Sequence, residues 1–495
     1  MIPMKLSLCA LSIAAVLTGC TIEKDPAPMS DVTEKSVGEL RALLKSGEIS
    51  SVGLVSQLLD KAEQHEELNA FIHVDRDGAL ELAATADAAG AEELEDKPLL
   101  GIPIVVKDNI HVAGMPNTAG TPALKEFVPE ASNAVVAKLQ AAGAIVLAKT
   151  NLHELAFGIT SNNATFGAVG NPHDPTMFAG GSSGGTASAI SAGLAPAGLG
   201  TDTGGSIRIP AALTGIVGFR PSSGRYDSTA VTPISSTRDT VGLIATSVAD
   251  VILLDSVVSG ASTSSDAVAA DRLRIGVPRA WFFDHMDSEL RIVIEEALQK
   301  LRDAGATLID ADVENIGDLI ARTSFPIALY EVVRELPAYL DEYGTGVTYE
   351  QLVEQIASPD VKGIFGTLGD GGPINDDAYA AALLARDLMK ETFTAYFAAH
   401  DLDAIVFPMT VLPARPIAGS DETVELNGER VPTFPTYIHN TDHATIAGMP
   451  SISLPAGMTA SGLPVGLAIE GPAGSDTRLL SIALAVEAIL GFASR

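Results

Sequence analysis

Cysteine, tryptophan and basic residues are all scarce in this sequence of 495 residues. It holds two cysteines, Cys9 and Cys20, so no network of disulfides is available to stabilise the fold. Lysine and arginine number 31 against 62 aspartates and glutamates, which gives a formal net charge of −31. Since phosphate binding requires a basic surface, we expect no nucleic-acid partner and interpret the acidity as a solvated surface.

Signatures of bound metals and cofactors are absent as well. No cluster of His, Cys and Asp has the spacing of a metal site, and we expect neither a metal nor a cofactor. Residues 198–200 (GLG) resemble part of a dinucleotide-binding loop but lack the full fingerprint, and no P-loop lysine motif occurs. His111, His153, His173 and His443 have no partner pattern, so we interpret them as ordinary core or surface histidines.

The first 19 residues have the pattern of an export signal. Lys5 precedes an apolar run, residues 6–17, that is too short for a permanent membrane span. Residues 17–20 (LTGC) resemble a bacterial lipobox, which implies cleavage before Cys20 and a lipid on its thiol. We therefore expect a signal peptide over 1–19, and a lipidated Cys20 with a tether over 20–35. The alternative is an ordinary secretory signal in which Cys20 stands by chance.

The hydrophobic pattern of the remaining chain predicts one large α/β domain over 36–495. A capping box at Ser36 and Glu39 opens an N-terminal helical layer, with further helices at 52–66 and 78–93. Strand and helix patterns then alternate, which predicts a mixed, mostly parallel twisted sheet between helices. Residues 311–400 are expected to be a variable, mostly helical region with a loop at 363–372. The other expected strands are 102–106, 145–148, 274–277, 404–408, 451–455 and 465–470, and the other expected helices are 133–142, 248–259, 288–304 and 477–489.

The stretch from 180 to 210 carries two clusters of glycine and serine, 180–185 (GGSSGG) and 201–206 (TDTGGS). Such a density of glycine marks backbone that another group approaches closely. Ser206 precedes a predicted helix start, where backbone N–H groups favour a nucleophile whose substrate develops negative charge. Ser182, and Ser183 in the register shifted by one, also match the elbow pattern of α/β-hydrolases, but residues 171–179 before them look like a loop rather than the required strand. Lys107 ends an apolar strand, and burial there would lower its pKa and make it a usable base.

These stretches together resemble the amidase signature family of serine hydrolases. Its pattern of a GGSSGG loop followed by GTDxGGS[IV]RxP stands here in full, and the resemblance extends over almost the whole chain from about residue 36. Residues 158–163 (GITSNN) and 236–240 (STRDT) resemble the mandelamide and indoleacetamide hydrolases of that family. The other segments that carry the resemblance are 101–108 (GIPIVVKD), 148–154 (AKTNLHE), 447–455 (AGMPSISLP) and 462–467 (GLPVGL).

The resemblance implies a catalytic triad of Ser206, Ser182 and Lys107. Ser206 would be the nucleophile, Ser182 would follow a cis peptide from Gly181 and relay protons, and neutral Lys107 would be the base. The oxyanion hole would consist of the backbone N–H groups of Thr203, Gly204, Gly205 and Ser206. Ser183 would be a hydrogen-bonding neighbour, and Asp202 and Arg208 would brace the loop rather than react.

The implied activity is hydrolysis of a small-molecule carboxamide, with aryl or arylalkyl amides favoured. Amino-acid or peptide amides, esters and carbamates remain open as substrates of the same triad. An amidotransferase subunit shares the fold, but export and acidity argue against it. A non-catalytic binding lipoprotein is a further alternative, against which the intact Lys107, Ser182 and Ser206 argue. The lipobox implies a bacterial envelope protein, and Thr21 after Cys20 points to the outer membrane, facing the periplasm.

Overall fold

The structure is a computed structural model that describes residues 32–90, 93, 96–263, 268–369 and 372–491. The predicted signal peptide, Cys20 and the tether up to residue 31 lie outside these residues. The chain from Val32 onward forms one compact unit, and Val32 itself is buried, so the folded unit begins before residue 36. Within the described residues, no helix has both the length and the apolar character needed to cross a membrane.

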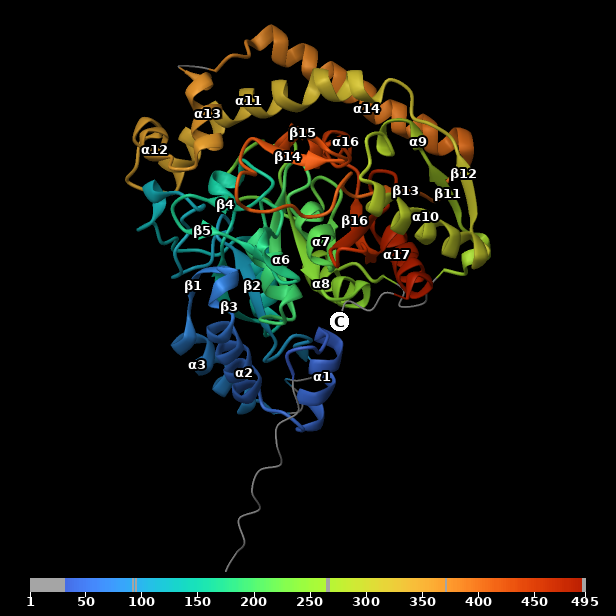
Figure 1. Cartoon of the computed structure of the whole chain (residues 1–495). Coiled ribbons are helices and arrows are strands. Elements are labelled where there is room, and N and C mark those ends of the chain that lie inside the picture. The colour runs from blue at the N-terminus through green and yellow to red at the C-terminus, as the bar shows by residue number, and fades with distance from the viewer. Residues whose placement is uncertain (1–31, 91–92, 94–95, 264–267, 370–371, 492–495) are drawn as a thin grey trace, which may run out of the picture. The chain divides into compact units, whose positions relative to one another are not determined.

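One sheet of eleven strands runs through this unit, between helices on both sides (Figure 1). It confirms the large mixed sheet of an α/β fold. The strand order is β1 (Phe71–Val74), β3 (Ile145–Thr150), β2 (Pro103–Lys107), β8 (Ala197–Asp202), β10 (Thr240–Ala245), β9 (Val217–Arg220), β16 (Ser451–Met458), β17 (Pro464–Glu470), β13 (Ala404–Pro408), β11 (Arg274–Val277) and β12 (Thr307–Asp310).

The share of parallel pairing is smaller than the sequence predicted. Parallel pairs join β3, β2 and β8 near one edge, and β13, β11 and β12 near the other. Every pairing from β8 through β10, β9, β16 and β17 to β13 is antiparallel, as is the pair of β1 with β3. The alternation of strands and helices suggested parallel crossovers, but β16 and β17 form a hairpin, which a short connection makes antiparallel.

Two groups of helices cover the sheet. The first is α6 (Gly184–Ser191) with α7 (Arg208–Thr214), whose residues are all buried. Glycines in the strands let α7 approach closely, since a Cβ at Gly466 would lie 2.4 Å from Cβ of Ala212. The second group contains α5 (Ala134–Ala141), α8 (Val248–Ser259), α10 (Ser288–Asp303) and α17 (Asp476–Leu490).

The predicted N-terminal helices form as α1 (Val37–Ser46), α2 (Ser51–Gln64) and α3 (Arg76–Asp87). The capping box at α1 is present: Glu39 N–H donates to Ser36 Oγ at 3.1 Å, and Ser36 N–H donates to Glu39 Oε2 at 2.9 Å. Two reciprocal bonds satisfy backbone donors that the first turn of a helix cannot pair internally.

The region 311–400 is helical, as expected, and α11 (Ile316–Glu342) and α14 (Asp376–His400) lie side by side in it (Figure 1). Between them are α12 (Tyr349–Gln355) and α13 (Pro359–Leu368). The loop predicted at 363–372 is wrong for residues 363–368, which belong to α13. Gly363 and Gly366 suggested a loop, but Val361, Phe365 and Leu368 bury one face and hold the helix in place.

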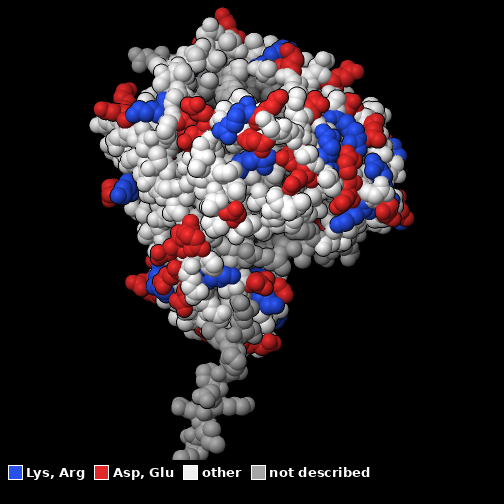
Figure 2. Space-filling model, viewed as in Figure 1, with Lys and Arg blue, Asp and Glu red and all other residues white. Residues whose placement is uncertain are grey.

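Acidic side chains are scattered over the face shown in Figure 2, with basic side chains among them. On this face they do not gather into one large patch. This dispersion agrees with the interpretation of the negative charge as a solvated surface rather than a binding patch.

Candidate active site

Lys107 lies at the end of β2, a fully buried strand and the third from one edge of the sheet. Its Nζ is 2.7 Å from Ser182 Oγ and 2.8 Å from Thr201 Oγ1 of β8. Burial lowers the pKa of Lys107 to about 7, although the negative charges of Asp202 and Asp239 act in the opposite direction and raise it. A substantial fraction of this lysine is therefore a neutral amine near neutral pH, which is the form that accepts a proton.

Ser182 stands in the loop before α6, and its peptide bond from Gly181 is cis, as the resemblance implied. Gly181 has no room for a side chain, because a Cβ there would lie 2.9 Å from backbone atoms of Ile159 and Ser161. Ser183 joins the two glycine-rich loops: its N–H donates to the carbonyl of Ser206 at 3.0 Å, and its Oγ to the carbonyl of Thr201 at 3.2 Å. The predicted neighbour role of Ser183 agrees with these contacts.

The α/β-hydrolase elbow does not fit the chain before Ser182. Residues 171–179 were expected to be a loop, but part of them forms β7 (Asp174–Phe178), which pairs with β6 (Gly170–Asn171). This two-stranded ribbon is separate from the large sheet, and Phe178 is the one buried residue of β7. The elbow requires a strand of the central sheet to lead directly into the nucleophile, which is absent here among the described strands.

Asp202 and Arg208 brace the loop that carries Ser206. Arg208 holds both carboxylate oxygens of Asp202, with Nε and Nη2 each at 3.0 Å, and Arg220 Nη1 lies 3.2 Å from Oδ1. The buried Asp202 carboxylate thereby has two cationic partners, which hold its pKa well below its usual range despite burial. Arg208 Nη1 also lies 3.4 Å from Glu470 Oε1, and Glu470 Oε2 lies 2.6 Å from His443 Nε2. These contacts fit the predicted bracing role and place His443 in a paired, buried position.

The backbone N–H groups of this loop divide into two sets. Gly205 N–H donates to Asp202 Oδ1 at 2.9 Å, so it braces the loop and the prediction of Gly205 as an oxyanion donor needs correction. In the described part of the chain, no acceptor is assigned to the N–H groups of Thr203, Gly204 or Ser206. These three remain as candidate donors to a substrate oxyanion.

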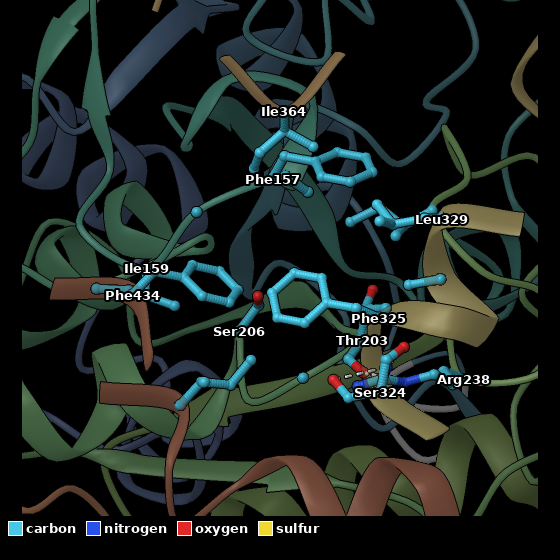
Figure 3. Close-up of a pocket in the computed structure, with 16 residues that line it drawn as sticks. Phe157, Ile159, Thr203, Ser206, Arg238, Ser324, Phe325, Leu329, Ile364 and Phe434 are labelled. Carbon is cyan, nitrogen blue, oxygen red and sulfur yellow. Dashed lines mark hydrogen bonds between the residues drawn. The ribbon is translucent and has the colours of Figure 1, made fainter. Parts of the chain in front are cut away.

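Ser206 opens onto an apolar pocket and is 8% exposed. Figure 3 shows its hydroxyl pointing between the rings of Phe325 and Phe434. About 590 Å³ of empty space, which includes open solvent, lies between the walls of the pocket. Its walls come from the loop after β3, the Ser206 loop, the segment before β10, α11, α13 and α15 (Thr433–Ile438). The other lining residues are Ala156, Phe157, Gly158, Ile159, Thr203, Gly204, Ile234, Arg238, Ser324, Ala328, Leu329, Ile364 and Ile438.

Three residues that sequence reasoning gave no role contact the site. Thr201 accepts hydrogen bonds from Lys107 and from Asn109 Nδ2 at 3.1 Å. Arg238 donates to the carbonyl of Thr203 at 3.1 Å, and Asp239 accepts from Thr203 Oγ1 at 2.5 Å. Arg238 and Asp239 lie in the STRDT segment, which was noted only as a resemblance. The contacts of Arg238 and Asp239 with the Ser206 loop depend on tertiary structure, so no local pattern could have indicated them.

Comparisons with known proteins agree with this geometry. The family model described as Amidase matches residues 53–480. The chain is 41% identical over 460 residues to an indoleacetamide hydrolase of Agrobacterium vitis, covering 93% of this chain and 98% of the relative. It is 44% identical over 480 residues to a mandelamide hydrolase of Pseudomonas putida, covering 92% of each chain. The crystal structure of a peptide amidase from Stenotrophomonas maltophilia superposes with a TM-score of 0.77 at 30% identity, covering 92% of this chain and 97% of that one. The chain therefore belongs to the amidase signature family and is an amide hydrolase.

Proposed function

We propose that this enzyme hydrolyses uncharged aryl or arylalkyl carboxamides through a Ser206 acyl-enzyme, with Ser182 and Lys107 moving the protons. The observation that carries the proposal is the 2.7 Å contact between the buried Lys107 amine and Ser182, in a loop hydrogen-bonded to Ser206. A nucleophilic serine needs a neighbouring base, and a buried lysine with a pKa near neutrality meets that need.

In the proposed acylation, Ser206 Oγ forms a bond to the amide carbon, and its proton passes through Ser182 to neutral Lys107. The carbonyl oxygen becomes an oxyanion, which the N–H groups of Gly204, Ser206 and Thr203 stabilise; one such donor contributes roughly 3–4 kcal/mol. Lys107, now an ammonium, returns the proton through Ser182 to the leaving amine as the C–N bond breaks. Water then cleaves the acyl-enzyme in the same way, which releases the carboxylate and restores Ser206.

The walls of the pocket favour a neutral, aromatic acyl group. Arg238 is the one charged residue among the pocket's lining residues, and protein groups occupy its donors: Asp442, Thr445 and the carbonyls of Thr203 and Ser324. A charged substrate group would enter this pocket without a counter-ion and at a desolvation cost. The names of the similar hydrolases of indoleacetamide and mandelamide support an aryl amide as the substrate.

A panel of amides scored for released ammonia tests this proposal. We expect indoleacetamide and mandelamide to give higher kcat/KM values than acetamide. The matched pair 3-phenylpropanamide and phenylalaninamide differs by the α-ammonium group, and we expect the neutral member to be preferred. A preference for phenylalaninamide would favour the alternative of amino-acid or peptide amides. If the corresponding esters or carbamates are turned over faster than every amide, the alternative of an esterase or carbamate hydrolase would be favoured.

We further propose that the enzyme is a lipoprotein, anchored through Cys20 to the outer membrane and facing the periplasm. The support is the lipobox-like LTGC at residues 17–20, after a short apolar run, and the polar stretch that follows it. The folded unit from Val32 onward contains Lys107, Ser182 and Ser206, so the anchor and the chemistry lie in separate parts of the chain.

A further inference from the structure

Arg238 connects the Ser206 loop to the wall of the pocket. The side chain is 3% exposed and forms an ion pair with Asp442 of α16 (Asp442–Ala447). Nε donates to the carbonyl of Thr203 at 3.1 Å, and Nη1 donates to the carbonyl of Ser324 in α11 at 2.9 Å. Figure 3 shows Arg238, Thr203 and Ser324 gathered beside Phe325. One guanidinium therefore holds backbone atoms of the loop and of the pocket helix together.

The Thr203 carbonyl matters because it shares a peptide unit with the Gly204 N–H. This unit is planar and trans, so a bond that fixes the direction of the carbonyl fixes the N–H in the opposite direction. Gly204 lines the pocket, and the part of the chain that is described offers its N–H no acceptor. The hydrogen bond from Arg238 thus determines where one candidate oxyanion donor points.

Asp239 holds the same residue by its side chain. Its Oδ1 accepts from Thr203 Oγ1 at 2.5 Å, and its Oδ2 accepts from the N–H groups of Ile234 and Ser235 at 2.8 and 2.9 Å. Thr203 is consequently fixed at two points, its carbonyl by Arg238 and its hydroxyl by Asp239. The amidase signature leaves this position open, so the second contact depends on the threonine that this chain carries.

Helix α11 supports the segment that bears Arg238 and Asp239, the two residues that together form a clamp on Thr203. Glu335 accepts from Ser236 N–H at 2.9 Å, and Glu331, one turn earlier, accepts from Thr237 Oγ1 at 3.1 Å. The same helix presents Phe325, Ala328 and Leu329 to the pocket. A single helix therefore both lines the acyl pocket and holds Ser236 and Thr237, which directly precede Arg238 and Asp239.

We propose that Arg238, together with Asp239, is a positioning residue that orients the Gly204 N–H toward the oxyanion and ties this donor to the pocket helix α11. The inference rests on the proposed function, because it assumes acyl transfer at Ser206. Loss of the clamp should weaken stabilisation of the oxyanion, which amides and activated esters both form. It should leave the proton route through Lys107 and Ser182 in place.

The test uses Arg238→Lys, Thr203→Val and Thr203→Ser, with kcat expressed per serine titrated by a fluorophosphonate probe. We expect Arg238→Lys and Thr203→Val to lower kcat by about tenfold or more, with KM nearly unchanged. The loss should be of similar size for an aryl amide and for an activated ester of the same acid. Thr203→Ser keeps the hydroxyl and should restore most of the lost kcat. If Arg238→Lys does not fold, the valine and serine variants at 203 still decide the question.

The matched control is Arg225→Lys, because Arg225 holds the buried Asp255 with bonds of 2.9 and 2.7 Å but does not line the pocket. We expect it to keep the wild-type kcat per titrated serine. The proposed positioning role would be contradicted if Arg238→Lys and Thr203→Val both kept the wild-type kcat. A loss of kcat confined to the amide would also contradict it, as would an equal loss in Arg225→Lys. Failure of the wild-type enzyme to turn over amides or to be labelled would instead count against the proposed function.

Discussion

At the scale of single residues, Lys107 is the base of the proposed chemistry. Its amine is fully buried between Ser182 and Thr201, and this burial is what lowers its pKa. The assignment of Lys107, Ser182 and Ser206 followed from sequence motifs, because these residues stand in fixed patterns. The positions of Arg238 and Asp239 could not be predicted, because Thr203, Ser324 and Asp442, which they contact, are distant in the sequence.

Replacing Lys107 should affect amides far more than activated esters. In Lys107→Ala the leaving amine has no proton source, so we expect kcat/KM for an amide to fall by about 10²–10⁴-fold. An activated ester has a good leaving group and should lose less. Ser182→Ala should behave in the same way, with slower labelling by a fluorophosphonate. Steady-state kinetics on an amide and its matched ester measure this difference, and Lys390→Ala serves as a surface control. Equal losses of kcat/KM for both substrates would contradict the proton route.

The activity should depend on pH through the same lysine. With the pKa of Lys107 near 7, the neutral base is the minor form below pH 7, and its fraction falls about tenfold for each further unit of acid. We therefore expect kcat/KM for an amide to rise with pH through about 7 and then level off. A pH–rate profile measures this, and an acid limb that persists unchanged in the residual activity of Lys107→Ala would exclude Lys107 as its origin.

At the scale of elements, β2, which carries Lys107, was easier to predict than β9 and β10. The apolar run of β2 was apparent in the sequence, whereas β9 and β10, which each contain a glycine, were missed; in β9 a Cβ at Gly218 would lie 2.6 Å from Cβ of Ala211 in α7. The antiparallel middle of the sheet could not be predicted, since the pairing of β9 with β16 joins segments far apart in the chain. Local patterns predict elements, but strand order depends on contacts between distant segments.

Helix α11 should set the preference for aromatic substrates through Phe325. This ring is 50% exposed and lies 5.9 Å from the Phe434 ring across the pocket. An aromatic contact of this kind contributes about 0.5–1.5 kcal/mol, so we expect Phe325→Ala to raise KM for an aryl amide by roughly three- to tenfold. Turnover of acetamide should hardly change. Kinetics on both amides measure the difference, with the exposed Leu384→Ala on α14 as the control, and an equal effect on acetamide would contradict the assignment.

At the scale of the whole molecule, charged side chains are spread over the surface that Figure 2 shows. The charged side chains in Figure 2 are dispersed, and the pocket walls carry one charged residue, Arg238, which protein groups neutralise. The sequence predicted the family and the single large domain, because motifs extend along nearly the whole chain. It did not specify the substrate, since the pocket walls come from segments that the signature leaves variable.

The proposed lipidation of Cys20 predicts that the whole chain is held in the membrane fraction. Cys20→Ala removes the thiol that would carry the lipid, so we expect the variant to leave the membrane fraction. Cys9→Ala changes the other cysteine, within the predicted signal, and should leave the anchor intact. Fractionation of cells with immunodetection measures this. Intact Cys20→Ala protein that stays with the membrane would show that another feature anchors it.

The identity of the serine that forms the acyl-enzyme decides the proposed mechanism. Labelling the intact enzyme with a fluorophosphonate and locating the adduct by peptide mass spectrometry tests this most directly. We predict one adduct, on Ser206, that Ser206→Ala abolishes together with amide turnover. An adduct on Ser182 or Ser183 in the wild-type enzyme, or amide hydrolysis that survives in Ser206→Ala, would contradict the account.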